Sequence, residues 1–293
     1  MRLKGLVAYV ALAAFWAVFF IGFSWATSLL GPGLSTAIFA AAVGLSLWAF
    51  ARLVGRRLTW RLQATAVLGA GGLTALVLLT LATAASLAGA SITAIVVSTI
   101  PLFATVVAQM RGLERVTGLG AISLLLGILG LMLVAGFRGG DAGWGFLGGV
   151  VAALGTAIAA GAAGQHVIGQ LHRPRAVEVA VSAAGIAAVC AVALIPLAPP
   201  VGIDPLAVLI LAILGVACGF LALFALSSAS QTVPTRTAAT LPGVGTVLAA
   251  AGGVILLGES VSVAQVFGMM LILCGTALLR GLVPGWFPAS WRS

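Results

Sequence analysis

Charged residues are scarce in this 293-residue chain, of which only 6% is Asp, Glu, Lys or Arg. A soluble globule needs more polar surface than this, so the composition excludes that class and predicts that a lipid bilayer is the solvent. The chain contains five acidic residues and 14 Lys and Arg, which gives a net charge of +9. Such a balance would suggest nucleic acid if the basic residues shared one soluble face. They stand instead at the ends of apolar runs, so no nucleic-acid partner is predicted.

Cysteine and histidine are equally sparse, with three of the first and two of the second. Cys190, Cys218 and Cys274 each lie in an apolar stretch without Cys-x-x-Cys or Cys/His spacing, which supports neither a disulfide framework nor a metal site. The histidines lack the nearby carboxylate that a membrane-embedded enzyme would need. No charged ring or carbonyl filter motif points to a channel. The sequence therefore predicts no catalytic residue, no metal and no cofactor.

Apolar residues are abundant, at 62% of the chain. A helix needs about 20 apolar residues to cross a hydrocarbon core of about 30 Å. Ten runs meet this length, so the predicted fold is an all-α integral membrane protein with ten transmembrane helices. The expected spans are 5–25, 33–52, 63–85, 91–110, 119–137, 144–165, 176–197, 206–226, 236–257 and 263–281. Although Arg2 and Lys4 precede the first run as in a secretory signal, nine similar runs follow, so we expect that run to be a retained span.

The positive residues predict the orientation, because cytoplasmic loops keep Lys and Arg. With the N-terminus inside, every Lys and Arg except Arg138 falls on the inner side. The opposite orientation would place all but that one outside. Both termini are therefore predicted to be cytoplasmic.

Two proline-containing stretches suggest an internal duplication. Thr99–Val106 contains Pro101, and Thr240–Val247 contains Pro242 in a matching setting, 141 positions later. Glu114 matches Glu259 and Gly130 matches Gly275, both displaced by 145 positions. The difference of four is close to one helical turn of about 3.6 residues, so the same helical face stays in register.

Five spans in each copy is an odd number, so the second copy must enter the membrane from the opposite side. Residues 1–138 and 139–293 are therefore predicted to be two inverted five-helix repeats around a central cavity. Exchange of conformation between inverted repeats converts an inward-open form into an outward-open one. This architecture favours a carrier that works by alternating access.

The end of the chain resembles the EamA-type domain of the drug/metabolite transporter superfamily. The resemblance rests on Leu257–Gly268, with its Gly-Glu turn, and on the Gly-rich span that continues through Leu271–Leu278; Trp16 in the first span also fits. It covers nearly the whole chain, but Gly112-Leu-Glu114 replaces the contiguous Gly-Glu in the first half. It implies export of small metabolites across a bacterial inner membrane. The YddG-like amino-acid exporters are one branch of similar length and topology.

Pro101 and Pro242 are the first candidate site residues. Each leaves the carbonyl four residues earlier without its helical donor, which frees backbone polarity at membrane depth. They can line a substrate cavity, or they can mark packing kinks whose loosened turns Ser98, Thr99 or Thr240 satisfy. Both interpretations stay open at this point.

Aromatic and hydroxyl side chains supply the other candidates. Trp16 and Phe20 can form an apolar wall, although Trp25 near the outer end fits an interfacial belt and phenylalanines can simply face lipid. The hydroxyls of Thr80, Thr83, Ser98 and Thr240 can bind a zwitterion, or they can satisfy the helix backbone. His166 can couple protons or be an ordinary interfacial histidine. The predicted substrate-binding residues are Trp16, Phe20, Thr80, Thr83, Ser98, Pro101, Thr240, Pro242 and His166.

The acidic residues are expected at span ends. Glu114 and Glu259 each precede a helix, so we interpret them as caps of the helix that follows. No charged residue lies at the middle of a span, whereas driven carriers usually need an ionisable site there. An uncoupled carrier of amino acids, with aromatic or other apolar ones favoured, is predicted; multidrug or lipophilic-cation export is the alternative. The expected partners are the small-molecule substrate and the bilayer, with the chain a monomer or weak dimer.

Overall fold

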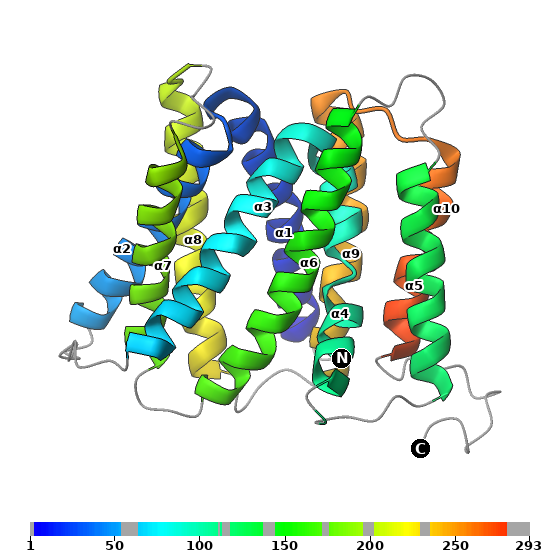
Figure 1. Cartoon of the computed structure of the whole chain (residues 1–293), viewed down its shortest axis with the longest axis horizontal. Helices are drawn as coiled ribbons and strands as arrows, with labels where there is room; N and C mark the ends of the chain where they lie inside the picture. The colour runs from blue at the N-terminus through cyan, green and yellow to red at the C-terminus, as the bar shows by residue number, and fades with distance from the viewer. Residues whose placement is uncertain are drawn as a thin grey trace. The chain divides into compact units, whose positions relative to one another are not determined.

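The computed structural model describes residues 3–53, 64–110, 112, 118–136, 144–171, 176–195, 202–228 and 235–279. Within these ranges the regular structure is helical, with ten helices and no strand, which confirms the predicted all-α fold. The helices are α1 (Leu3–Leu30), α2 (Pro32–Leu53), α3 (Ala64–Val97), α4 (Ile100–Met110), α5 (Gly118–Gly136), α6 (Trp144–Leu171), α7 (Ala176–Leu194), α8 (Pro205–Ser228), α9 (Thr235–Leu257) and α10 (Val263–Leu279) (Figure 1).

Length and composition make this chain a multi-pass membrane protein. Five segments in the described part are long and apolar enough to cross a bilayer: Ala13–Leu30, Pro32–Leu53, Gly69–Val97, Gly118–Gly136 and Trp144–Gly161. The remaining five helices contain shorter apolar stretches. Each of the ten apolar runs is helical in its described residues, with a break inside the fourth, because a helix bonds its own backbone groups where no water can do so.

The third and fourth spans are divided by two breaks. Gly89 has φ 84° and ψ 175°, so α3 consists of one helix before Gly89 and a short segment, 90–97, after it. Only glycine adopts this region of backbone space readily. A second break at Ser98 and Thr99 separates segment 90–97 from α4. The fourth span, expected as one helix over 91–110, is thus two helical pieces with a bend just before Pro101.

The chain forms two compact units that do not follow the sequence halves. Unit 1 comprises Met1–Ile21, Leu87–Ala162 and Val233–Ser293, whereas unit 2 comprises Gly22–Ser86 and Ala163–Thr232. Each unit therefore takes helices from both halves of the chain. The predicted cavity residues fall into both units, and each unit is described by itself.

Small residues build the core of unit 2. Helix α2 packs against α7 and α8 (Figure 1). A side-chain carbon at Gly44 would lie 3.3 Å from Ala184 Cβ, and one at Gly33 would lie 3.4 Å from Ile195 Cγ1, so α2 and α7 run antiparallel. A side-chain carbon at Gly215 of α8 would lie 2.8 Å from the Phe39 carbonyl. Close packing through such residues is the usual way in which membrane helices associate.

Candidate functional site

Six of the predicted site residues lie in unit 1, four of them with described side chains, and two of these four belong to an aromatic cluster on α1. The Trp16 and Phe20 rings are 5.4 Å apart and nearly perpendicular, and Phe19 and Phe20 repeat this edge-to-face arrangement at 5.4 Å. Phe20 is buried, whereas Trp16 is half-buried. Such pairs are favourable beyond the area that they bury. The predicted aromatic wall is thus a packed cluster with Trp16 at its more open side.

Trp16 lies directly on Gly245 of α9. A side-chain carbon at Gly245 would be 2.6 Å from Trp16 Cδ1 and 2.9 Å from Trp16 Cβ, so only glycine fits beneath this ring. Gly245 follows Pro242 by about one helical turn. The structure therefore brings Trp16 to the turn of α9 that follows this proline. The sequence analysis missed Gly245, although a glycine so close to a helix proline was a possible signal.

Two hydroxyl groups bond within the turn that precedes Pro101. Pro101 has no N–H, so the helix ladder is interrupted here. The Thr99 N–H donates to the Val96 carbonyl at 3.0 Å, and the Leu102 N–H donates to the Thr99 carbonyl at 2.9 Å. The Ser98 hydroxyl donates to the Ile95 carbonyl, and the Thr99 hydroxyl donates to the Val96 carbonyl, both at 2.6 Å. The backbone breaks just before Pro101, and the Ser98 and Thr99 hydroxyls bond to carbonyls of the preceding turn. The cavity and packing-kink interpretations of Pro101 both stay predictions.

Thr80 and Thr83 belong to unit 2 and bond to their own helix. The Thr80 hydroxyl donates to the Leu76 carbonyl at 2.6 Å, and the Thr83 hydroxyl donates to the Leu79 carbonyl at 2.8 Å. Both residues are half-buried. This is the backbone-satisfying alternative for these threonines. A substrate contact would use the acceptor capacity that their oxygens keep, and it stays a prediction.

Three predicted site residues have no described side chain. Thr240 and Pro242 lie in the backbone of α9, and His166 lies in the backbone of α6, but their side chains are outside the described part. Glu114 also lies outside the described residues. The roles predicted for these four residues stay predictions.

Glu259 caps a helix, but not the helix that follows it. Its carboxylate accepts the N–H of Ala90 at 2.5 Å and that of Ser91 at 2.8 Å, where segment 90–97 begins. Helix α10 has its own cap, because the Gln265 N–H donates to the Ser262 hydroxyl at 3.2 Å and the Ser262 N–H donates to Gln265 Oε1 at 2.8 Å. This reciprocal pair is a capping box. The predicted capping role is right and the predicted helix is wrong, because the break at Gly89 frees N–H groups that the sequence pattern did not reveal.

Two glycines form a cradle around the Glu259 carboxylate. A side-chain carbon at Gly89 would collide with Glu259 Oε1, and one at Gly253 would lie 2.5 Å from Oε2. The Ser91 hydroxyl donates to the Ala250 carbonyl at 3.0 Å, which ties the same turn to α9. The start of segment 90–97 is thus held by three side-chain hydrogen bonds, all to residues of α9 or the turn after it.

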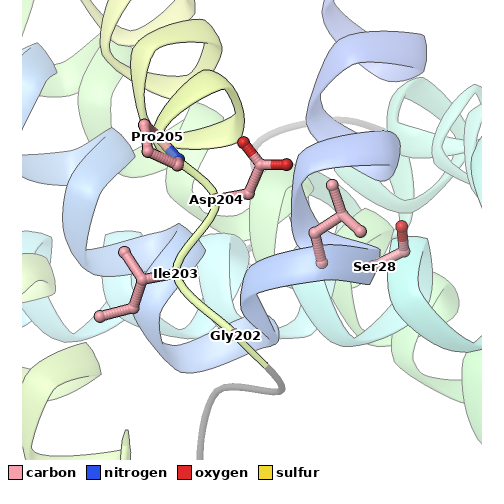
Figure 2. Close-up of a pocket in the computed structure, with 6 residues that line it drawn as sticks. Ser28, Gly202, Ile203, Asp204 and Pro205 are labelled. Atoms are coloured by element: carbon pink, nitrogen blue, oxygen red, sulfur yellow. The ribbon is translucent and has the colours of Figure 1, made fainter.

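A separate hollow of about 460 Å³ lies in unit 2, lined by Ser28, Leu29, Gly202, Ile203, Asp204 and Pro205 (Figure 2). Asp204 Oδ1 accepts the N–H groups of Leu206 at 2.7 Å and Ala207 at 3.3 Å, so this carboxylate caps α8. In the described part of the chain, no group of three or more His, Cys, Asp or Glu gathers as metal ligands would. We assign no function to this hollow.

The second half of this chain matches a known family of transporters. The EamA-like transporter family matches residues 143–281, which include α6 to α10. The family confirms the resemblance seen at the Gly-Glu turn, which lies within the matched segment. It does not distinguish the amino-acid exporter branch.

Two curated relatives share a shorter stretch. The multidrug resistance protein EbrB of Bacillus subtilis (strain 168) is 44% identical over 70 residues, which are 23% of this chain and 60% of that protein. The EbrB protein of Bacillus atrophaeus is 43% identical over 68 residues, 22% of this chain and 58% of that protein. This chain thus spans about 60% of the length of the curated relatives that it matches.

A solved crystal structure of another protein has the same fold. It covers 93% of this chain and 96% of that chain with a TM-score of 0.61 and 20% sequence identity. At this identity the likeness shows the fold alone. The likeness includes the first half of the chain, which the family match does not reach.

Proposed function

We propose that this protein is a secondary transporter that exports small metabolites across a bacterial inner membrane by alternating access. The observation that carries the proposal is the family match over residues 143–281. The relatives named as multidrug resistance proteins support outward movement of small molecules.

Contacts between α5 and α10 support the inverted repeat that this mechanism needs. A side-chain carbon at Gly130 would lie 2.6 Å from the Gly268 carbonyl and 3.1 Å from the Ile272 nitrogen. One at Gly275 would lie 2.7 Å from the Ser123 carbonyl and 3.4 Å from the Gly127 nitrogen. Adding 145 to a residue number in α5, or subtracting 145 from one in α10, converts the two contacts of Gly130 into the two contacts of Gly275. The contacted atoms, a carbonyl oxygen and a backbone nitrogen, are the same in both cases.

A two-fold axis produces this pattern, because it exchanges the two partners of a contact for their equivalents in the other half. Gly130 on Gly268 thus becomes Gly275 on Ser123. The 145-position shift is the one that relates Glu114 to Glu259 and Gly130 to Gly275 in the sequence. Residue numbers rise along α5 as they fall along α10, so these two helices are antiparallel. Equivalent helices of inverted repeats have this relation.

The composition of the two units also supports the repeat. Unit 1 contains α4, α5, α9 and α10, and unit 2 contains α2, α7 and α8 with most of α3. Helices α1 and α6 are both divided between the units, at Ile21 and Ala162. Under a five-helix repeat, α1, α2, α4 and α5 thus share their unit or their division with their counterparts, whereas only the part of α3 before Leu87 shares the unit of α8.

Amino acids, with aromatic or other apolar ones favoured, are the substrates that we propose. Trp16 is half-buried at the edge of an aromatic cluster, which suits an apolar side chain. Multidrug or lipophilic-cation export is the second candidate, and the names of the relatives favour it. A carboxylate in the membrane usually matches such a cation, and no span of this sequence has a mid-span acidic residue. Amino acids therefore stay ahead.

Transport by purified protein in proteoliposomes tests the proposal. Counterflow of the twenty amino acids and of a panel of lipophilic cations is measured with and without a proton gradient. We expect saturable counterflow of an apolar or aromatic amino acid in both conditions, since we propose uncoupled transport. Counterflow of cations alone would establish the second candidate, and uphill accumulation driven by the gradient would contradict the uncoupled mechanism. No flux for any compound would contradict carrier function.

A pair of tryptophan variants tests the site. Trp16→Ala removes the proposed wall, whereas the control Trp144→Ala removes a tryptophan that is 90% exposed at the start of α6. We expect Trp16→Ala to weaken substrate binding about tenfold or more, as the loss of a large buried aromatic contact does. Equal effects of the two variants would remove Trp16 from the substrate site.

A further inference from the structure

The turn between α9 and α10 holds segment 90–97, which is a separate piece of helix. It begins after the non-helical residue Gly89 and ends at the break of Ser98 and Thr99. Every residue from 90 to 99 is buried. A buried helix with a break at each end can tilt as a rigid piece, because only the residues at the two breaks change their backbone angles.

The attachment of this segment is one-sided and specific. The Glu259 carboxylate accepts both of the first N–H groups, and the Ser91 hydroxyl donates to Ala250. Gly89 and Gly253 leave no space for any side chain next to the carboxylate. The other end has no such attachment in the described contacts, since the Ser98 and Thr99 hydroxyls bond within their own turn.

We propose that Glu259 is a positioning residue that latches segment 90–97 and thereby sets the rate of the conformational change of transport. While the carboxylate is bound, the segment is fixed relative to the α9–α10 turn. When it leaves, the segment pivots at Gly89 and at Ser98–Thr99, and the bend before Pro101 moves with it. The consequence for transport rests on the proposed function, whereas the latch itself can be tested without a substrate.

Hydrogen exchange measured by mass spectrometry on the full chain in detergent tests the latch. Glu259→Ala removes both acceptors, and Glu259→Gln keeps a single carbonyl oxygen. We expect Glu259→Ala to speed exchange of amides 90–97 about tenfold or more, because it removes both acceptors of the cap. Glu259→Gln should have a smaller effect, because it keeps one acceptor oxygen. The matched control is Ser262→Ala, which removes the cap of α10 from the same turn. It is expected to speed exchange at the start of α10 and to leave 90–97 within about twofold.

Transport by the same variants separates a latch from a structural cap. A latch that controls the conformational change alters the maximal rate about threefold or more and leaves KM within about twofold. Unchanged exchange at 90–97 in Glu259→Ala would overturn the latch, as would exchange that rises equally in α5 and α10. Faster exchange with an unchanged maximal rate would overturn the control of transport. If the wild-type protein moves no compound while Glu259→Ala still speeds local exchange, the proposed function fails and the latch stands.

Discussion

Two sets of helix contacts in unit 1 use the proposed repeat differently. Between α5 and α10, each half supplies a glycine that lies against a backbone carbonyl of the other, Gly130 on Gly268 and Gly275 on Ser123. In the second set, Trp16 of α1 lies on Gly245 of α9. The shift of 145 positions relates Trp16 to Gly161, and the shift of 141 relates Gly245 to Ala104. Gly161 of α6 does lie on Ala104, because a side-chain carbon added at Gly161 would be 2.8 Å from the Ala104 nitrogen.

This difference separates packing from specificity. The first contact is the same in both halves, since two helices that must approach closely need glycine on both sides. The second contact has a tryptophan in one half and a glycine in the other, so the same position closes tightly in α4 and α6 but carries a bulky ring between α1 and α9. The asymmetry lies at the residue that we propose for substrate binding.

The largest effects are expected where the halves are equivalent. Gly130→Val and Gly275→Val each force a branched side chain against a backbone carbonyl, which costs about 1–3 kcal/mol or more. Thermal unfolding in detergent should show a large loss for both variants, equal within about 1 kcal/mol because the contacts are equivalent. Gly136→Ala at the end of α5, with nothing within 4 Å of the added carbon, is the control. Full tolerance of one valine would break the equivalence.

A second prediction concerns the close contact between Gly161 of α6 and Ala104 of α4. A side-chain carbon at Gly161 would lie 2.8 Å from the Ala104 nitrogen, so Gly161→Ala has to push two backbones apart. We expect a loss of about 1–3 kcal/mol in the free energy of unfolding. In Gly148→Ala, on the same helix, the added carbon lies 3.6 Å from Leu87 Cδ1, which is an ordinary contact. Its unfolding temperature should stay near that of the wild type, and equal losses in both variants would contradict the argument.

The contact between Trp16 and Gly245 predicts an energetic coupling between two substitutions, which the contact between Gly161 and Ala104 does not. Gly245→Ala clashes with the side chain of Trp16, so Trp16→Ala, which removes Cγ and Cδ1 and keeps Cβ, should relieve most of the clash. A double-mutant cycle on unfolding should give an interaction energy of about 0.5–3 kcal/mol. Truncation of a side chain cannot relieve Gly161→Ala in this way, because its obstacle is backbone. A cycle that closes to zero would show that Trp16 does not rest on Gly245.

The smallest effect is expected at the break before Pro101. Ser98 corresponds to Ala239 under the shift of the prolines, so Ser98→Ala makes the first half resemble the second. The lost bond to the Ile95 carbonyl contributes about 0.5–1.5 kcal/mol. Unfolding should change by no more than this, while KM for the substrate should rise severalfold if the predicted contact exists. An unchanged KM would remove Ser98 from the site.

Much of the fold and part of the site could be predicted from the sequence. The ten helices follow from the length of the apolar runs, and the bend at Ser98–Thr99 follows from the missing N–H of Pro101. The interaction of the Ser98 and Thr99 hydroxyls with the loosened turn is local, so it could also be anticipated. The partner of Glu259 could not, because Ser91 is 168 residues away in sequence and its N–H became free only through the backbone of Gly89.

The sequence alone determined the secondary structure of each segment. An apolar run in lipid must bond its own backbone groups, so length and composition suffice to make it a helix. Tertiary structure decided which segments meet: Glu259 caps segment 90–97 while Ser262 caps α10, and Trp16 covers Gly245. The reason is that free N–H groups and glycine surfaces are chemically alike along the whole chain. Only packing selects which of them lies within the few ångströms over which a hydrogen bond or a side-chain contact acts.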